Sequence, residues 1–188
     1  FTTSKIIRTK TEIGRSPVSI AFAAIKLAQQ IHGNLSNSTA LIVGAGETTT
    51  LVARHLSHTN IGKVYVANRT RANSKSITEI CGGETIGLTD IPKFLPLADI
   101  VISSITTKKP IISIDIARLS IEKRKGHPIF FVDLGVPRNI EESIGSLESS
   151  FLYTIDDLRV IVESNIGARS AASIEAEEIV NFKTSDFL

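Results

Sequence analysis

A short glycine-containing turn directly after an apolar run is the first pattern in this sequence that could serve chemistry. The run 40–43 suits a buried central strand, and the glycines that follow allow a tight turn and a close approach of the backbone to a pyrophosphate. The amides of a helix starting at residue 47 would point at the same phosphates. Thr49 replaces the third glycine of the G-x-G-x-x-G pattern, so this prediction needs support from its surroundings. The predicted phosphate loop comprises Gly44, Ala45, Gly46, Glu47, Thr48 and Thr49.

The end of the next predicted strand indicates which dinucleotide would bind. Strand 63–67 runs into Asn68-Arg69-Thr70-Arg71, without the carboxylate that NAD-binding folds use to accept hydrogen bonds from the ribose hydroxyls. A carboxylate would repel a 2′-phosphate, whereas a guanidinium can pair with it through two parallel hydrogen bonds. The pattern favours NADP over NAD, with Asn68, Arg69 and Thr70 at the adenosine-phosphate end. The alternative is that Arg69 and Arg71 are solvated cations at the start of a helix.

Two further strand ends should reach the same crevice, because ligands bind at the carboxyl edge of a doubly wound sheet. One strand ends in Ser103 and Ser104, whose small hydroxyl side chains either line the path of the nicotinamide ribose and ring or cap their own loop. Another ends in Asp133, followed by Leu-Gly-Val-Pro, which predicts a shaped turn. Asp133 either anchors that turn or contributes to the site, and both alternatives stay open.

No other residue pattern indicates catalysis. Cys81 ends an amphipathic helix without nearby histidine or metal-ligand spacing, so we interpret it as structural. His55 and His58 share a helix but lack a carboxylate partner, and they predict no metal site. The sequence shows no Ser-His-Asp arrangement and no paired carboxylates. It therefore predicts a cofactor site without catalytic residues of its own.

The elements that must position these residues are predicted from short apolar runs that alternate with amphipathic stretches. A first helix begins at Ser16-Pro17 and ends at Gly33. The alternation predicts an α/β fold, namely a Rossmann-type doubly wound parallel sheet over residues 16–154. Strands are expected at 39–43, 63–67, 84–87, 99–103, 128–133 and 151–153, and helices at 47–58, 71–81, 90–96 and 113–124.

The two ends of the chain differ from this central domain. Residues 1–15 are polar and are expected to form a linker from another domain. Residues 155–188 begin with an apolar stripe that lacks proline, and this predicts a long helix of about 28 residues, roughly 42 Å at 1.5 Å per residue. We expect the start of a connector helix that meets another domain or subunit. The alternative is a helix folded back on the sheet.

Composition narrows the class of protein. With 188 residues, 42% apolar and 21% charged, the chain suits a globular domain with a substantial core. It has no apolar run long enough to span a bilayer, no signal peptide and a single cysteine, so we expect a cytoplasmic protein. A net charge of +2 does not by itself argue for nucleic acid. Because the chain lacks methionine, we expect a segment of a longer protein.

A set of motifs recurs here in the order found in one enzyme family. On these motifs the whole chain resembles glutamyl-tRNA reductase, namely its NADPH-binding domain with the entering linker and the start of its long spinal helix. The resemblance implies NADPH as the cofactor and places the phosphate loop, Asn68–Thr70 and Ser103–Ser104 in the nucleotide site. The motifs are Arg8-Thr9-Lys10-Thr11-Glu12-Ile13-Gly14, Gly44-Ala45-Gly46-Glu47-Thr48, Ala67-Asn68-Arg69-Thr70, Asp99-Ile100-Val101-Ile102-Ser103-Ser104, Val136-Pro137-Arg138 and Phe151-Leu152-Tyr153.

The resemblance also implies what the whole enzyme does. The family's N-terminal domain carries a nucleophilic cysteine that attacks glutamyl-tRNA to form a thioester, and NADPH reduces this to glutamate-1-semialdehyde for tetrapyrrole (porphyrin) synthesis. The Ser/Thr-Cys-Asn-Arg setting of that cysteine is absent here, so this chain alone is expected to bind NADPH without reductase activity. Family members are V-shaped homodimers, and the aminomutase that acts next is a candidate partner.

Two alternatives of different classes stay open. A shikimate dehydrogenase-like domain would use the same sheet and the same Asn-Arg-Thr end, with its catalytic lysine and aspartate in a preceding domain. The long C-terminal helix argues against it. A nucleotide-sensing module would have no chemistry of its own, and full-length protein of that kind would show no turnover of glutamyl-tRNA.

Overall fold

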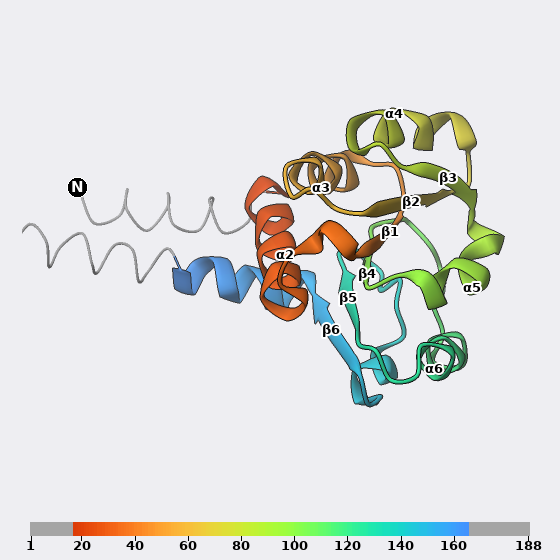
Figure 1. The fold of residues 1–188 in the computed structure, drawn as a ribbon. Coiled ribbons are helices and arrows are strands. Elements are labelled where there is room, and N and C mark those ends of the chain that lie inside the picture. Colours follow the sequence, from red (N-terminus) through yellow and green to blue (C-terminus); the bar gives the residue numbers. More distant parts are fainter. Residues whose placement is uncertain (1–16, 166–188) are drawn as a thin grey trace, which may run out of the picture.

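A parallel β-sheet organises the structure. The computed structural model describes residues 17–165 of the chain. Within these residues six strands lie in the order β3-β2-β1-β4-β5-β6, and each neighbouring pair is parallel (Figure 1). This confirms the predicted Rossmann-type doubly wound fold, and every predicted strand agrees with an observed one to within one residue at either end. The strands are β1 (Thr39–Val43), β2 (Lys63–Asn68), β3 (Glu84–Gly87), β4 (Ile100–Ser103), β5 (Ile129–Asp133) and β6 (Ser150–Thr154).

Helices connect the strands, as the alternating patterns predict. They are α2 (Pro17–His32), α3 (Glu47–Ser57), α4 (Arg71–Cys81), α5 (Ile91–Phe94) and α6 (Ile114–Lys123), with 3-10 helices at Leu35–Asn37, Leu88–Asp90, Leu95–Leu97 and Glu142–Ser146. The helix predicted at 90–96 is therefore a single α-helical turn flanked by 3-10 turns. Residues 155–165 are helical and follow β6 directly, whereas the predicted linker at 1–15 and the part of the predicted C-terminal helix beyond residue 165 lie outside the described residues. None of the described helices is long and apolar enough to cross a membrane.

The sheet buries both of its faces, because alternate residues of each strand point to opposite sides. On one face Ala40 and Ile42 of β1 pack with residues of α2, α3 and α4. On the other face Leu41 and Val43 pack with residues of α5 and α6. All four side chains are fully buried, which explains why a central parallel strand reads as a continuous apolar run.

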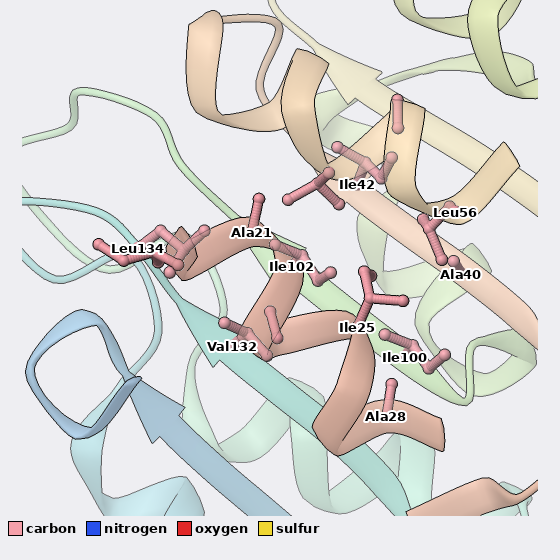
Figure 2. Packing of buried hydrophobic residues seen from close by; sticks show 14 of the residues in the cluster. Ala21, Ile25, Ala28, Ala40, Ile42, Leu56, Ile100, Ile102, Val132 and Leu134 are labelled. Atoms are coloured by element: carbon pink, nitrogen blue, oxygen red, sulfur yellow. The ribbon is translucent and has the colours of Figure 1, made fainter. Parts of the chain in front are cut away.

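Helix α2 packs closely over the middle of the sheet. Figure 2 shows Ala21, Ile25 and Ala28 of this helix near the strand residues Ile102 and Val132. The two alanines are fully buried, and their small side chains let the helix backbone approach the strands. The helix thus covers one face at β4 and β5, and its neighbour α3 covers the same face beside it (Figure 1).

An ion pair lies at the amino edge of the sheet, opposite the predicted site. Asp99 precedes β4 and accepts hydrogen bonds from the Thr39 amide (2.8 Å) and from Arg124 Nη2 (2.5 Å). Arg124 also donates to the carbonyl oxygens of Pro96 (3.1 Å) and Pro128 (3.2 Å). This network joins the starts of β1, β4 and β5.

Candidate functional site

The predicted site lies at the carboxyl edge of the sheet, where the strand order changes direction. From β1 the chain continues to β2 on one side, and later returns to add β4 on the other, so the ends of β1 and β4 are neighbours. Open α/β sheets bind ligands outside this point, because the loops leave the sheet in opposite directions there. The segments that follow β1, β2, β4 and β5 all lie along this edge (Figure 1).

Gly44 begins the turn after β1 and adopts a backbone conformation that favours glycine. Its φ is +113°, and its N–H donates to the Ala67 carbonyl near the end of β2 (2.8 Å). A side chain at this position would collide with the Ser104 carbonyl and the Ile105 side chain. Both the backbone conformation and the close approach of the loop after β4 therefore require glycine here.

Gly46 serves the same turn for another reason, since the space beside it is open. A Cβ atom built on Gly46 would meet no atom within 4 Å, and the residue is exposed. Gly46 is the N-cap residue of α3, and among the described residues no side chain caps this helix. The amides of the first turn of α3 are thus left without a side-chain acceptor. Open space beside uncapped helix amides fits the phosphates of a dinucleotide.

Thr49 stands in the place of the third glycine and is accommodated by packing and a hydrogen bond. Its side chain is fully buried, and Oγ1 donates to the Gly46 carbonyl (2.9 Å). The same carbonyl accepts from the Thr50 amide (3.0 Å) and from Thr50 Oγ1 (2.9 Å). Three donors on one carbonyl hold the start of α3 against the turn, so the departure from the glycine pattern leaves the turn intact.

The segment after β2 presents a cation at the edge of the sheet. Asn68 ends this strand, and its Nδ2 donates to the Thr70 carbonyl (3.1 Å), which shapes the loop between them. Arg69 is exposed and makes no ion pair with any residue that the structure describes. Thr70 precedes α4 without capping it through its side chain. An unpaired guanidinium beside an uncapped helix start suits a phosphate group.

The two serines predicted at the end of β4 differ in their surroundings. Ser103 is fully buried, and its hydroxyl donates to Asn139 Oδ1 (3.0 Å). Ser104 is half-buried, and its amide donates to the Val43 carbonyl at the end of β1 (2.9 Å). The Ser103 side chain thus bonds inside the protein, whereas Ser104 is partly exposed at the same edge of the sheet.

Asp133 anchors its own turn. The residue is 1% exposed, and its Oδ1 accepts from the Gly135 amide (2.9 Å). Its Oδ2 accepts from the amides of Asn139 (2.8 Å) and Ile140 (2.9 Å). Three backbone donors satisfy the buried carboxylate, and this decides between the two alternatives that the sequence leaves open for Asp133.

Asn139 is a residue of this edge that the sequence patterns do not single out. It is fully buried, and its side chain contacts both the loop after β4 and the turn after β5. Asparagine is common in turns, so its type and position carry little signal. The nearest indication in the sequence is the turn predicted after Asp133. The Asp133 carboxylate accepts a hydrogen bond from the backbone N–H of Asn139.

Cys81 behaves as a structural residue. It ends α4, and its Sγ donates to the Ile77 carbonyl (3.2 Å). Burial raises the pKa of this thiol above its ordinary value of 9.0, which disfavours the reactive thiolate. Among the described residues no group of three or more His, Cys, Asp and Glu side chains could hold a metal ion.

Strand order, glycine turn and exposed cation together define a dinucleotide-binding domain of the Rossmann type. A family model described as shikimate / quinate 5-dehydrogenase matches residues 26–161, and the chain belongs to this family. The matched range includes all four segments of the crevice.

Within this class, glutamyl-tRNA reductases resemble the chain over its whole length. Glutamyl-tRNA reductase from Hydrogenovibrio crunogenus is 46% identical over 188 residues, which is 100% of this chain and 43% of the relative. The structure of glutamyl-tRNA reductase from Methanopyrus kandleri matches with a TM-score of 0.78 and 34% identity, covering 94% of this chain and 45% of its own. The resemblance stated from the motifs is thereby confirmed, and the chain spans less than half the length of these relatives.

A third match supports the fold. The nucleotide-binding domain of glutamyl-tRNA reductase from Thermoplasma volcanium has a TM-score of 0.63 and 24% identity. It covers 80% of this chain and 96% of its own length. At this identity the match shows the fold alone.

Proposed function

We propose that the chain is the NADPH-binding domain of an NADPH-dependent glutamyl-tRNA reductase, which reduces glutamyl-tRNA to glutamate-1-semialdehyde. The observation that carries this proposal is the 46% identity over the whole chain to a relative of that name. The shikimate dehydrogenase-like alternative shares the fold and the family model, but the whole-length relatives favour the reductase. Because the chain covers 43% of that relative, its substrate, activity and partners concern the longer protein.

The geometry of the crevice supports NADPH as the cofactor. The open space beside Gly46 and the uncapped start of α3 would receive the pyrophosphate. The unpaired guanidinium of Arg69 would bind the 2′-phosphate, with Asn68 and Thr70 shaping its loop. Ser104 would lie beside the nicotinamide half, and Ser103 would act through the backbone that its buried hydroxyl supports. When bound, NADPH supplies a hydride, and this chain's residues bind and orient it.

The nucleophile of the reaction would come from another part of the protein. Cys81 lies at the end of α4, about 15 Å along the helix axis from the start that faces the crevice. We propose a nucleophilic cysteine in a preceding domain, a homodimer and a cytoplasmic setting for the full-length enzyme. The aminomutase that acts on the product is a further proposed partner.

Activity of the full-length protein tests this function. Purified enzyme supplied with glutamyl-tRNA and NADPH should form glutamate-1-semialdehyde and oxidise an equal amount of NADPH. In parallel, the 188-residue chain should bind NADPH in an isothermal titration without turning over glutamyl-tRNA. NADPH binding without turnover by the full-length protein would support the nucleotide-sensing alternative instead.

A further inference from the structure

Asn139 uses every hydrogen-bonding position of its side-chain amide inside the protein. Oδ1 accepts from Ser103 Oγ (3.0 Å) and from the Ile105 amide (2.8 Å). Nδ2 donates to the carbonyls of Ile105 (2.9 Å) and Pro137 (3.1 Å). A buried amide is favourable only when it is fully bonded, so these four contacts set one orientation of the side chain.

The backbone of Asn139 holds the other end of the same loop. Its carbonyl accepts from the amides of Ile111 (2.7 Å) and Ile112 (3.2 Å). Asn139 therefore binds both ends of the loop 105–111. Its side chain contacts Ile105 at the start, and its backbone carbonyl contacts Ile111 at the end. The tip of the loop carries Lys108 and Lys109, which are exposed.

This clamped loop forms one wall of the crevice. A Cβ atom on Gly44 would collide with the Ser104 carbonyl and the Ile105 side chain. The loop after β4 therefore contacts the predicted phosphate loop directly. In doubly wound sheets the adenosine half of a dinucleotide lies over β1 and β2, and the other half crosses to β4 and β5. The loop after β4 and the turn after β5 thus border the nicotinamide half.

We propose that Asn139 is a positioning residue for the nicotinamide half of the dinucleotide, because it sets the loop after β4 against the turn after β5. This inference rests on the proposed NADPH function. Asn139 does not touch the nucleotide itself and acts through the backbone of Ile105 and Pro137. Substitution should therefore weaken the nicotinamide half of the site and leave the adenosine-phosphate half unchanged.

Two ligands separate the two halves of the site in the 188-residue chain. NADPH reports on the whole site, and adenosine 2′,5′-bisphosphate reports on the adenosine-phosphate half alone. Asn139→Asp keeps the side-chain size but places an oxygen against two carbonyl oxygens, so it should raise the Kd for NADPH about tenfold. The Kd for adenosine 2′,5′-bisphosphate should stay within about twofold. Ser103→Ala removes one of the four contacts and should weaken NADPH selectively by a smaller factor, about threefold.

A variant at the opposite edge of the sheet serves as the matched control. Asp99→Asn disturbs a partly buried hydrogen-bonded network and should lower the melting temperature without changing either Kd. Equal weakening of both ligands by the Asn139 and Ser103 variants would overturn the positioning role, and so would selective loss of NADPH in Asp99→Asn. If the unmodified chain binds neither ligand, the proposed NADPH function itself is wrong, and the two failures are thus distinguishable.

Discussion

Removal of the Arg69 guanidinium should change the affinity for NADPH much more than the affinity for NADH. Arg69 is exposed and forms no ion pair with any described residue, so Arg69→Ala breaks no interaction that stabilises the described fold. Substitutions of this kind change the free energy of unfolding by no more than about 0.5 kcal/mol. A loss of affinity then reports on the ligand contact alone.

The expected loss follows from the exposure of the side chain. Hydrogen bonds to a charged group contribute about 1.5–3 kcal/mol, and solvent and salt screen an exposed guanidinium toward the lower end. Each difference of about 1.4 kcal/mol changes a Kd tenfold. We therefore expect the Kd for NADPH to rise about tenfold in Arg69→Ala at about 0.15 M salt, with a larger loss at lower ionic strength. NADH lacks the 2′-phosphate, so its Kd should change less than about twofold.

Isothermal titration of both nucleotides into the 188-residue chain measures these changes. Arg54→Ala is the control, because it removes another exposed positive charge, from the last turn of α3 and away from the crevice. It should leave both Kd values unchanged. Equal losses for NADPH and NADH in Arg69→Ala would refute the 2′-phosphate assignment and would indicate a general electrostatic effect.

Three further predictions concern other parts of the chain. Gly44→Ala should abolish NADPH binding in a fluorescence titration, because φ of +113° is strained for alanine and the added Cβ strikes the Ser104 carbonyl. Cys81→Ser in the full-length enzyme should leave single-turnover reduction intact, and loss of thioester formation would contradict the structural role of this thiol. Burial lowers the pKa of His32 from 6.5, so below that pH the unfolded chain binds more protons than the folded chain. The melting temperature should therefore fall as the pH drops through about 6.5, and His32→Gln should reduce this slope.

Local patterns in the sequence predict most of the fold. Strand 39–43 and helix 71–81 have the predicted bounds, because a strand buried on both faces gives a continuous apolar run and an amphipathic helix gives a helical period. The sequence patterns do not predict the 3-10 helices at Leu35–Asn37 and Glu142–Ser146. Segments of three to five residues are too short to show a helical period.

The candidate site divides in the same way. Gly44, Gly46 and Arg69 can be predicted as candidate site residues from the sequence, because a glycine turn after one strand and a cation after the next combine into one pattern. The direction of the Ser103 hydroxyl is not recognisable, since its partner Asn139 lies 36 residues away along the chain. The sequence alone treats the two serines alike, but burial separates them.

The sequence by itself determined the succession of strands and helices along the chain. It also determined the glycine turn after the first strand and the presence of a cation, in place of a carboxylate, after the second. These depend on backbone conformation and charge, which each residue carries wherever it lies. Only the tertiary structure decided that Asp133 anchors a turn and that Asn139 clamps the loop 105–111. Those roles depend on hydrogen bonds between segments that meet only when β4 and β5 lie side by side, because a buried polar group takes its function from the partners that folding brings to it.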